Sequence, residues 1–309
     1  MLSISNLGVT FTQYDQGLRR KQLCVITDLN LDVNAGEVVA VVGASGSGKS
    51  LLAHALLGIL PKNATISGTM QFQGEPLTPA RCRELRGQTI ALIPQSVGYL
   101  DPLMTVGSQV QRVAQLGGRT TAEASTSVNN TFARYDLPIS VRDRYPFQLS
   151  GGMARRVLVS TAVVTPAQLV IADEPTPGLH PEVVVETLSH LKALAAEGRG
   201  VILITHDIEA ALQIANRVAV FYAGTTVEIA AARDFSNGNL RHPYTQALWR
   251  SLPQNDFVPV PGNQPSPEQL PPGCLFGDRC PLVSEQCRVE RPPLRKLNNG
   301  WVRCIHAEG

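Results

Sequence analysis

Short apolar runs recur along most of the chain and are separated by polar and turn-forming segments. The runs occupy 38–42, 90–93, 169–172, 201–204 and 218–221. Patterns with helical spacing alternate with them, as at 182–197 and 207–216. A strand covered by helices on both faces reads as a continuous apolar run, because neither face meets water. The pattern therefore predicts an α/β fold with a mainly parallel core sheet covered by helices.

Other regions of the chain depart from this pattern. Residues 2–11 and 66–73 alternate apolar and polar positions, which is typical of antiparallel strands. Residues 105–165 contain no obvious buried strand, which indicates a helical insertion. From about Pro253 prolines crowd, the periodicity fades and four cysteines appear. We therefore expect a large domain with an antiparallel β subdomain and a helical subdomain, followed by a small separate extension. The predicted boundaries are 1–252 for the large domain, about 97–165 for its helical subdomain and 253–309 for the extension.

A glycine-rich turn joins the first apolar run to a helical pattern. Residues 43–50 read Gly-Ala-Ser-Gly-Ser-Gly-Lys-Ser, the spacing of a loop that wraps the phosphates of a nucleotide. Its glycines let backbone N–H groups approach phosphate oxygens. They are Gly43, Gly46 and Gly48. Lys49 is expected to reach the β- and γ-phosphates and the Ser50 hydroxyl to bind Mg²⁺. This motif predicts binding of a nucleoside triphosphate.

Charge and hydropathy limit what such a chain does. The formal net charge of +2 is no electrostatic footprint for nucleic acid, so no nucleic-acid partner is expected. No apolar run approaches the roughly 18 residues of a membrane span, and the N-terminus lacks the pattern of a signal peptide. We expect a soluble, cytosolic chain whose role at a membrane depends on a partner.

Polar residues follow three of the predicted buried strands. Asp173 and Glu174 end one strand, where an aspartate is placed to hold Mg²⁺ and a glutamate to act as general base toward the attacking water. His206 follows the next strand, where it can contact the γ-phosphate, and Gln95 ends another, where it can sense that phosphate through Mg²⁺ or water. A single histidine or glutamine is more often an ordinary loop residue.

A second anion site is indicated by Ser150, Gly151 and Gly152, which open a helix. Two phosphate cradles cannot serve one nucleotide, so the second is expected to serve the nucleotide of another subunit.

Taken in this order, the segments resemble the nucleotide-binding subunit of an ATP-binding cassette (ABC) transporter. The Walker A motif is 43–50, the glutamine loop centres on Gln95, the signature is 149–153, Walker B is 169–174 and the switch histidine is His206. The resemblance implies an ABC-type P-loop ATPase that uses ATP and Mg²⁺, with Ser45 and Leu51 among the nucleotide-binding residues. It also implies two cassettes facing head to tail, so that the signature residues contact the partner's ATP. Phe11 fits the aromatic that stacks on adenine, with Tyr14 as the alternative.

Two positions depart from the family pattern. His180 stands where the loop after Walker B usually carries an aspartate, which puts communication between the two ATP sites in doubt. Met153 replaces the glutamine common after the signature, as occurs in the peptide and nickel branch of the family.

The C-terminal region resembles the extension of oligopeptide, dipeptide and nickel importer ATPases. The resemblance rests on 241–248, on 270–276 and on the cysteine segments that follow. It implies a heterodimer with a second homologous ATPase, two permease subunits and an extracytoplasmic solute-binding protein. The chain would then be peripheral, on the cytoplasmic face of the membrane, and 99–106 would receive a permease. Short peptides are the expected cargo, nickel or a metal chelate is the alternative, and a non-transport ABC ATPase is the remote one.

Four of the six cysteines cluster in the extension. Cys274, Cys280, Cys287 and Cys304 have the spacing C-x5-C-x6-C-x16-C. Disulfides are disfavoured in the cytosol, so clustered cysteines suggest a metal site, although zinc sites favour C-x2-C pairs. Four thiolates suit a 4Fe-4S cluster, which members of this subgroup carry, and zinc or metal-free thiols remain alternatives. A redox or iron-sensing role for such a cluster is a further alternative. His306 is a possible substitute ligand, and Cys24 and Cys82 are expected to be inert.

Overall fold

The structure is a computed structural model that describes residues 1–14 and 19–308. The chain folds into two compact units, each of which combines segments that are distant in sequence. Unit 1 comprises Met1–Val33, Val39–Leu77 and Thr205–Gly309, and unit 2 comprises Asn34–Val38 and Thr78–Ile204. The phosphate loop and the C-terminal extension therefore belong to unit 1, whereas Walker B, the glutamine loop and the signature belong to unit 2.

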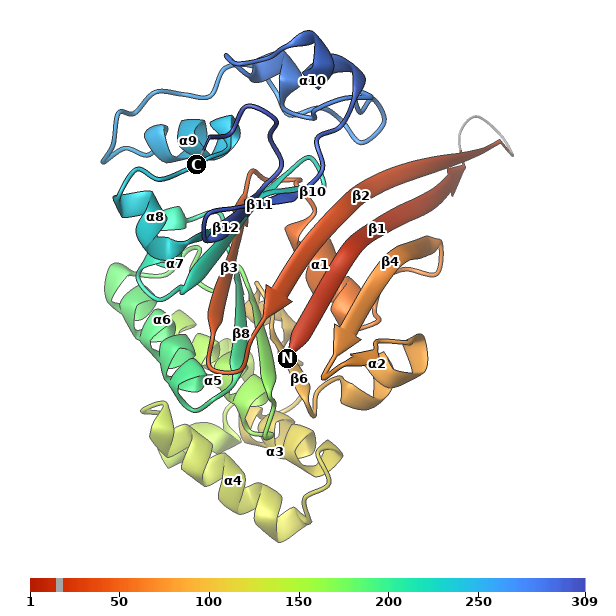
Figure 1. Cartoon of the computed structure of the whole chain (residues 1–309). Coiled ribbons are helices and arrows are strands. Elements are labelled where there is room, and N and C mark those ends of the chain that lie inside the picture. Colours follow the sequence, from red (N-terminus) through yellow and green to blue (C-terminus); the bar gives the residue numbers. More distant parts are fainter. Residues whose placement is uncertain (15–18, 309) are drawn as a thin grey trace. The chain divides into compact units, whose positions relative to one another are not determined.

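Unit 1 contains an antiparallel sheet with the strand order β2-β1-β4-β5. Its strands are β1 (Leu2–Tyr14), β2 (Arg20–Val33), β4 (Ala64–Phe72) and β5 (Glu75–Pro76). Leu2 pairs with Val33 on one side and with Phe72 on the other, and the long β1 and β2 curve side by side (Figure 1). The expectation of antiparallel strands at 2–11 and 66–73 is confirmed, although β2 was not predicted.

The second sheet of unit 1 leads into the phosphate loop. In this unit its strand order is β11-β12-β10-β9-β3. The strands are β3 (Val38–Gly43), β9 (Arg217–Tyr222), β10 (Thr225–Ala231), β11 (Arg295–Leu297) and β12 (Gly300–Val302). β3 and β9 are parallel, and a two-residue turn at Ala223 and Gly224, both with positive φ, joins β9 to the antiparallel β10. Ile229 of β10 pairs with Trp301 of β12, so the last strands of the extension continue this sheet.

Buried polar contacts fasten the two sheets of unit 1 to each other. The Thr226 hydroxyl of β10 accepts a hydrogen bond from the Asn30 N–H of β2 at 3.0 Å and donates to the Asn30 carbonyl at 2.9 Å. Arg303 donates to the carbonyls of Thr226 and Asp28, and it forms an ion pair with the Asp28 carboxylate at 2.6 Å. Arg303, which follows β12, therefore contacts both sheets of unit 1.

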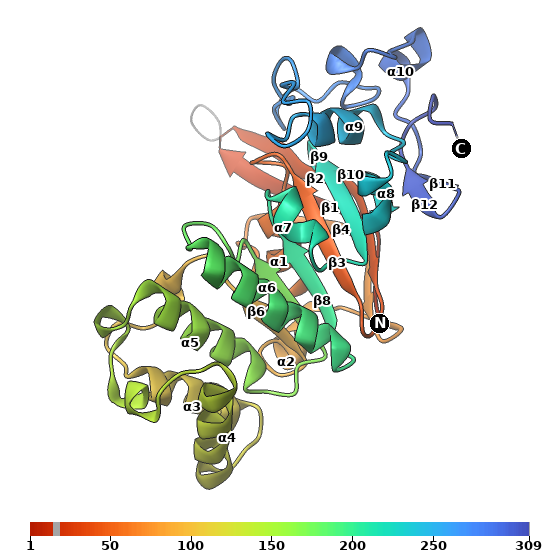
Figure 2. The same cartoon turned by 90° about the vertical axis from the view of Figure 1, so that its left-hand side faces the viewer.

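Unit 2 contains three parallel strands in the order β8-β7-β6. They are β6 (Ile90–Ile93), β7 (Leu169–Asp173) and β8 (Gly200–Ile204). Ile171 of β7 pairs with Leu92 and with Ile202, in the register of a parallel sheet. Every residue of β7 and β8 is buried, which explains their continuous apolar sequence. The predicted parallel core is confirmed, and helix α6 (Pro181–Ala196) matches the pattern at 182–197 (Figure 2).

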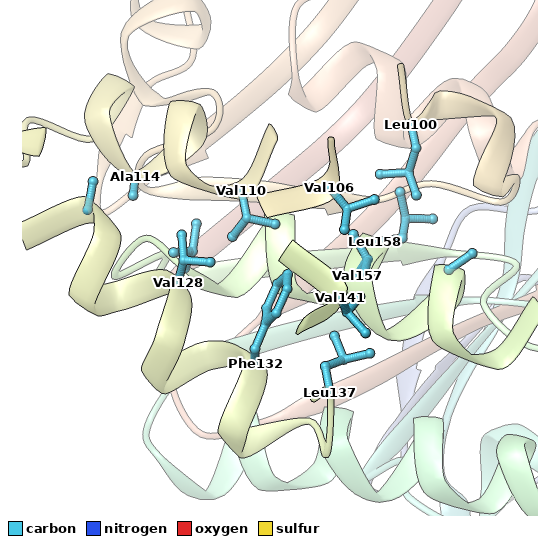
Figure 3. Packing of buried hydrophobic residues seen from close by; sticks show 13 residues of the cluster. Leu100, Val106, Val110, Ala114, Val128, Phe132, Leu137, Val141, Val157 and Leu158 are labelled. Atoms are coloured by element: carbon cyan, nitrogen blue, oxygen red, sulfur yellow. The ribbon is translucent and has the colours of Figure 1, made fainter. Parts of the chain in front are cut away.

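The helical insertion of unit 2 has its own apolar core. It comprises α3 (Val106–Leu116), α4 (Thr121–Arg134), η2 (Ile139–Asp143), η3 (Pro146–Gln148) and α5 (Gly151–Val163). Phe132 of α4 lies among Val110 of α3 and Val157 of α5, all fully buried (Figure 3). A capping box of Thr120 and Glu123 begins α4. Residues 105–165 contain no strand, as predicted.

The remaining helices are short. They are α1 (Lys49–Leu56), α2 (Pro79–Leu85), η1 (Val97–Tyr99), α7 (Ile208–Leu212), α8 (Ala232–Ser236), α9 (Pro243–Arg250), η4 (Gly277–Arg279) and α10 (Glu285–Val289). Helix α7 is shorter than the predicted 207–216, and α8 and α9 pack beside β10 (Figure 2). In the described part of the chain, no helix is long and apolar enough to cross a membrane.

Candidate active site

The phosphate loop of unit 1 has the shape that its glycines permit. A Cβ at Gly43 would lie 2.2 Å from the Phe221 carbonyl oxygen of β9, so no larger residue fits there. Gly46 and Gly48 have φ of +78° and +93°, in the left-handed region that favours glycine. Gly48 is also the N-cap of α1, whose first N–H groups form an anion-binding end. The local geometry supports the predicted cradle for phosphate.

The ammonium of Lys49 lies against this loop. Lys49 is buried, and its Nζ donates to the Gly43 carbonyl at 2.9 Å and to the Ala44 carbonyl at 3.1 Å. The loop thus holds a positive charge against its own backbone, next to the N-terminal end of α1. Of the other predicted residues here, Ser50 and Leu51 are half-buried in the first turn of α1, and Ser45 is exposed.

The predicted switch histidine, His206, comes directly after a residue that contacts β3, the strand that leads into the phosphate loop. The Thr205 N–H donates to the Val41 carbonyl of β3 at 3.1 Å, and the next residue, His206, has an exposed side chain. Asp207 caps α7 by accepting the Ala210 N–H at 2.9 Å. The local structure therefore gives Asp207 a structural role, and contact of His206 with a nucleotide stays a prediction.

The two carboxylates of Walker B are buried at the end of β7 in unit 2. Asp173 and Glu174 are 7% and 8% exposed. Glu174 has φ of +45°, which is costly for a residue with a side chain and is typical of functional sites. Its N–H donates to the Ile204 carbonyl of β8 at 2.8 Å, which holds the strained residue in place. Burial and strain at one position indicate a function rather than a stabilising role.

Arg155 of α5 connects the segments that follow β6 and β7 in unit 2. Its Nη1 donates to the carbonyls of Pro94 and Gln95 at 3.0 and 3.1 Å, and its Nη2 donates to the Glu174 carbonyl at 3.4 Å. The side chain is 3% exposed, and burial lowers its pKa to about 10, so it stays cationic at neutral pH. Sequence reasoning missed this residue, because two adjacent arginines give no sign of which one turns inward.

The signature begins α5. Ser150 is the N-cap of this helix, and its hydroxyl accepts the Met153 N–H at 3.3 Å. A Cβ at Gly151 would meet no atom within 4 Å, and one at Gly152 would meet only Val183 at 3.9 Å. Glycine within a helix costs about 0.5–1 kcal/mol relative to alanine. Among the residues that the structure describes, neither position is therefore crowded enough to require a glycine.

The other side chains predicted to contact the nucleotide or Mg²⁺ are half-buried or exposed. Phe11 is half-buried on β1, paired with Leu23 and Ala64, whereas Tyr14 is exposed with the Arg20 guanidinium 5.8 Å from its ring centre. The Gln95 side chain is exposed.

The two departures from the family pattern also have simple settings. His180 is the exposed N-cap of α6 and makes no side-chain cap hydrogen bond. Met153 packs against the core of the helical insertion. The methionine therefore has a packing role, and the structure assigns none to the histidine.

The four clustered cysteines are near neighbours in unit 1. Burial and the other three thiols raise the pKa of Cys274 to about 11, and its N–H donates to the Cys287 carbonyl at 2.7 Å. His306 contacts the Ser284 hydroxyl at 3.0 Å, and the same hydroxyl lies 3.4 Å from the Cys287 Sγ. Within residues 1–14 and 19–308, no three His, Cys, Asp or Glu side chains are arranged as ligands of one metal ion. The thiols are close enough to affect one another, but in the described part of the chain their side chains do not form a ligand set.

The fold is that of an ABC transporter ATPase. The dimeric structure of MJ0796, a bacterial ABC transporter cassette, matches with a TM-score of 0.66 and 24% identity. The match covers 75% of this chain and 99% of the other. The fold class expected from the apolar runs is thereby confirmed.

Sequence comparison is more specific than the fold. Residues 26–177 match the ABC transporter family, and residues 227–287 match the oligopeptide/dipeptide transporter C-terminal region. The oligopeptide transport ATP-binding protein OppD of Salmonella typhimurium is 36% identical over 98% of this chain and 92% of its own length. The dipeptide transport ATP-binding protein DppD of Escherichia coli is 34% identical, over 97% and 94%. The chain belongs to the ATP-binding subunits of ABC transporters, in the oligopeptide/dipeptide family, and is an ATPase.

Proposed function

We propose that this chain hydrolyses ATP to power the import of short peptides. The observation that carries the proposal is the likeness, over nearly the whole chain, to proteins named for oligopeptide and dipeptide transport. The phosphate loop and the strained Walker B glutamate supply the chemistry that this role needs.

In the proposed reaction, ATP binds with its phosphates against the loop 43–50 and the start of α1. Lys49 neutralises phosphate charge, and Glu174 accepts the proton of the attacking water. The oxygens of Ser50, Asp173 and Gln95 are donors of the type that Mg²⁺ prefers, and the ion would offset charge on the phosphates. His206 is proposed to orient the water at the γ-phosphate.

We further propose that a second, homologous cassette completes each ATP site. Gly151 and Gly152 support this proposal, because a glycine that its own chain does not require permits close approach of an outside group. Permease subunits and a solute-binding protein would complete the importer at the cytoplasmic face of the membrane. Tyr99 and Leu103, which are 67% and 85% exposed, support a permease contact over 99–106.

Uptake by the native host tests the transport role. Strains carrying wild type, Lys49→Ala or the matched control Lys62→Ala, an exposed lysine outside the loop, would be given labelled dipeptides and oligopeptides beside radioactive nickel. Loss of peptide uptake in Lys49→Ala alone supports the proposal. Loss of nickel uptake alone assigns the chain to a nickel importer instead. If neither changes while the variant protein is present and cannot hydrolyse ATP, both assignments fail.

For the extension we propose a 4Fe-4S cluster held by Cys274, Cys280, Cys287 and Cys304. The mutual effect of the four thiols on the pKa of Cys274 supports their proximity, and binding requires side-chain rotation into a ligand set together with loss of the thiol protons. Anaerobic purification followed by iron, sulfide and zinc analysis is the test. Iron and sulfide in equal amounts support the cluster, zinc alone supports a zinc site, and colourless protein free of all three excludes both.

A further inference from the structure

Tyr244 links the C-terminal extension to the phosphate loop. It lies in α9, inside the segment that matches the peptide-transporter C-terminal region, and it is 2% exposed. The Ala44 N–H, the first after Gly43 in the loop, donates to the Tyr244 hydroxyl at 3.3 Å across 200 residues of sequence. We propose that Tyr244 is a positioning residue for nucleotide binding, and that the extension sets its position. The proposal rests on ATP binding at this loop.

Ala44 is held at both of its backbone polar groups. Its N–H donates to Tyr244, and its carbonyl accepts the Lys49 ammonium at 3.1 Å. The Ala44 N–H shares its peptide group with the Gly43 carbonyl, which accepts the Lys49 ammonium at 2.9 Å, so the tyrosine fixes a peptide group against which this lysine rests. A loop that already has its binding shape loses less conformational entropy when the nucleotide binds, so this bond favours affinity.

The backbone of Tyr244 is fixed as well. Its N–H donates to Nδ1 of His242, the N-cap of α9, at 3.0 Å. The His242 N–H in turn donates to the buried Glu228 carboxylate of β10 at 2.9 Å. The ring and its hydroxyl are thus anchored to the sheet that carries the loop.

The Tyr244 ring packs against one ring of the extension, Phe276, and against Tyr222 of β9. The centre of the Phe276 ring lies 5.4 Å from that of Tyr244, and the Tyr222 ring centre lies 4.4 Å from it. The Arg279 guanidinium stands 5.7 Å from the Phe276 ring centre and donates to the Tyr222 hydroxyl at 3.1 Å. Phe276 and Arg279 lie between Cys274 and Cys280 in sequence. We therefore expect a change of conformation at these cysteines to affect the packing of Phe276 against Tyr244.

A pair of tyrosine variants isolates the hydrogen bond. Tyr244→Phe removes the hydroxyl that holds Ala44, and the control Tyr135→Phe removes a buried hydroxyl from the helical insertion of unit 2. Binding of ATP and ADP to the purified full-length chain would be measured by titration calorimetry, with steady-state ATPase assays on the importer complex. We expect Tyr244→Phe to raise Kd and the KM for ATP about two- to tenfold, the range for one lost hydrogen bond, with little change in kcat. We expect Tyr135→Phe to bind like wild type.

Three outcomes decide this experiment. Unchanged binding by a folded Tyr244→Phe variant overturns the positioning role. An equal loss in Tyr135→Phe also overturns it, because the effect then does not depend on the contact with the loop. If the wild-type chain itself binds no ATP, the proposed function fails, which is a separate result.

A double-mutant cycle tests the contribution of the extension. Phe276→Leu keeps an apolar side chain but removes the ring contact, and we expect it to weaken ATP binding in wild type and not in the Tyr244→Phe background. Additive losses would show that the extension does not act through Tyr244. If Phe276→Leu does not fold, Arg279→Met takes its place in the same cycle, with the same two readings.

Discussion

At the scale of single residues, strain and burial coincide at Glu174. A left-handed backbone and a buried carboxylate are both unfavourable, and selection for stability alone would remove them. The sequence marks the residue only as the second of two acids after an apolar run. The backbone conformation adds the physical sign that this carboxylate has a task.

Replacing the proposed general base tests that task directly. Glu174→Gln keeps the shape but cannot accept a proton, so we expect ATP hydrolysis to fall about 10²- to 10⁴-fold while ATP binding is retained. Phosphate release and nucleotide titration measure the two properties. The matched variant Glu182→Gln, an exposed acid in the first turn of α6, is expected to hydrolyse ATP normally. Unchanged turnover in Glu174→Gln would show that another group is the base.

Arg155 acts at the same scale through the groups that it holds. Arg155→Met removes the donors to the Gln95 and Glu174 carbonyls, and we expect kcat to fall about ten- to a hundredfold from misplacement of these residues. The Kd for ATP is expected to change less than twofold, since the phosphate loop lies in unit 1. Arg155→Lys, which keeps one donor group, should recover part of kcat, and the exposed Arg112→Met serves as control. An equal loss of binding would indicate general misfolding instead.

At the scale of elements, the junction of β10 with α9 depends on a neutral histidine. Burial lowers the pKa of His242 to about 3; the charge of Arg303 also lowers it, and a hydrogen bond with the Arg303 backbone acts in the opposite direction. The residue is 2% exposed, and its Nδ1 accepts the Tyr244 N–H. Protonation would place a proton on the atom that accepts this bond. Nearby Glu228 is also buried, and burial raises its pKa.

The pH dependence of stability follows from the direction of this shift. As the pH falls, the histidine of the unfolded chain, with a pKa near 6.5, binds its proton at a higher pH than the histidine of the folded chain. The stabilising contribution of neutral His242 is therefore complete above pH 6.5 and is lost progressively as the pH falls toward 3. Glu228 acts oppositely, because its raised pKa favours the folded state as the pH falls.

The variant His242→Asn separates the two groups, since asparagine does not titrate and is also a good N-cap. We expect urea unfolding between pH 7.5 and 4.5 to show a smaller loss of stability for His242→Asn than for wild type. The difference should approach about 1.4 kcal/mol per pH unit. If stability falls equally with pH in the two proteins, burial does not keep His242 neutral in the folded state.

At the scale of the whole molecule, the residues predicted to act on ATP belong to two different units. Unit 1 supplies the phosphate loop and His206, and unit 2 supplies Gln95, Asp173, Glu174 and the signature. Each unit has its own core, and the extension belongs to unit 1 through the pairing of β12 with β10. The predicted domain boundary at 252/253 stays a prediction, although the sheet crosses it.

A charge in the signature tests whether the site is completed by another subunit. We expect Ser150→Arg to abolish hydrolysis by the assembled importer while this chain still binds ATP, because the signature serves the partner's nucleotide. ATPase assays on complexes purified from the host, with Ser189→Arg on exposed α6 as the control, measure this. Normal hydrolysis by the Ser150→Arg complex would contradict the head-to-tail arrangement.

The sequence by itself determined the elements whose pattern is local. The run at 90–93 coincides with β6, because a strand buried on both faces leaves a continuous apolar signature. The phosphate loop was equally readable, since its glycines and lysine act within eight consecutive residues. The predicted roles of His206 and Phe11 remain predictions.

Tertiary structure decided what depends on distant partners. β2 and β12 were not predicted. β2 is partly polar and β12 is very short, so each is recognised as a strand only by its pairing with neighbouring strands. Arg155 turns inward because carbonyl groups that follow β6 and β7 accept its hydrogen bonds. The contact of Tyr244 with Ala44 joins residues 200 positions apart. Local chemistry is written in consecutive residues, whereas burial and long-range hydrogen bonds exist only once packing has brought separate segments together.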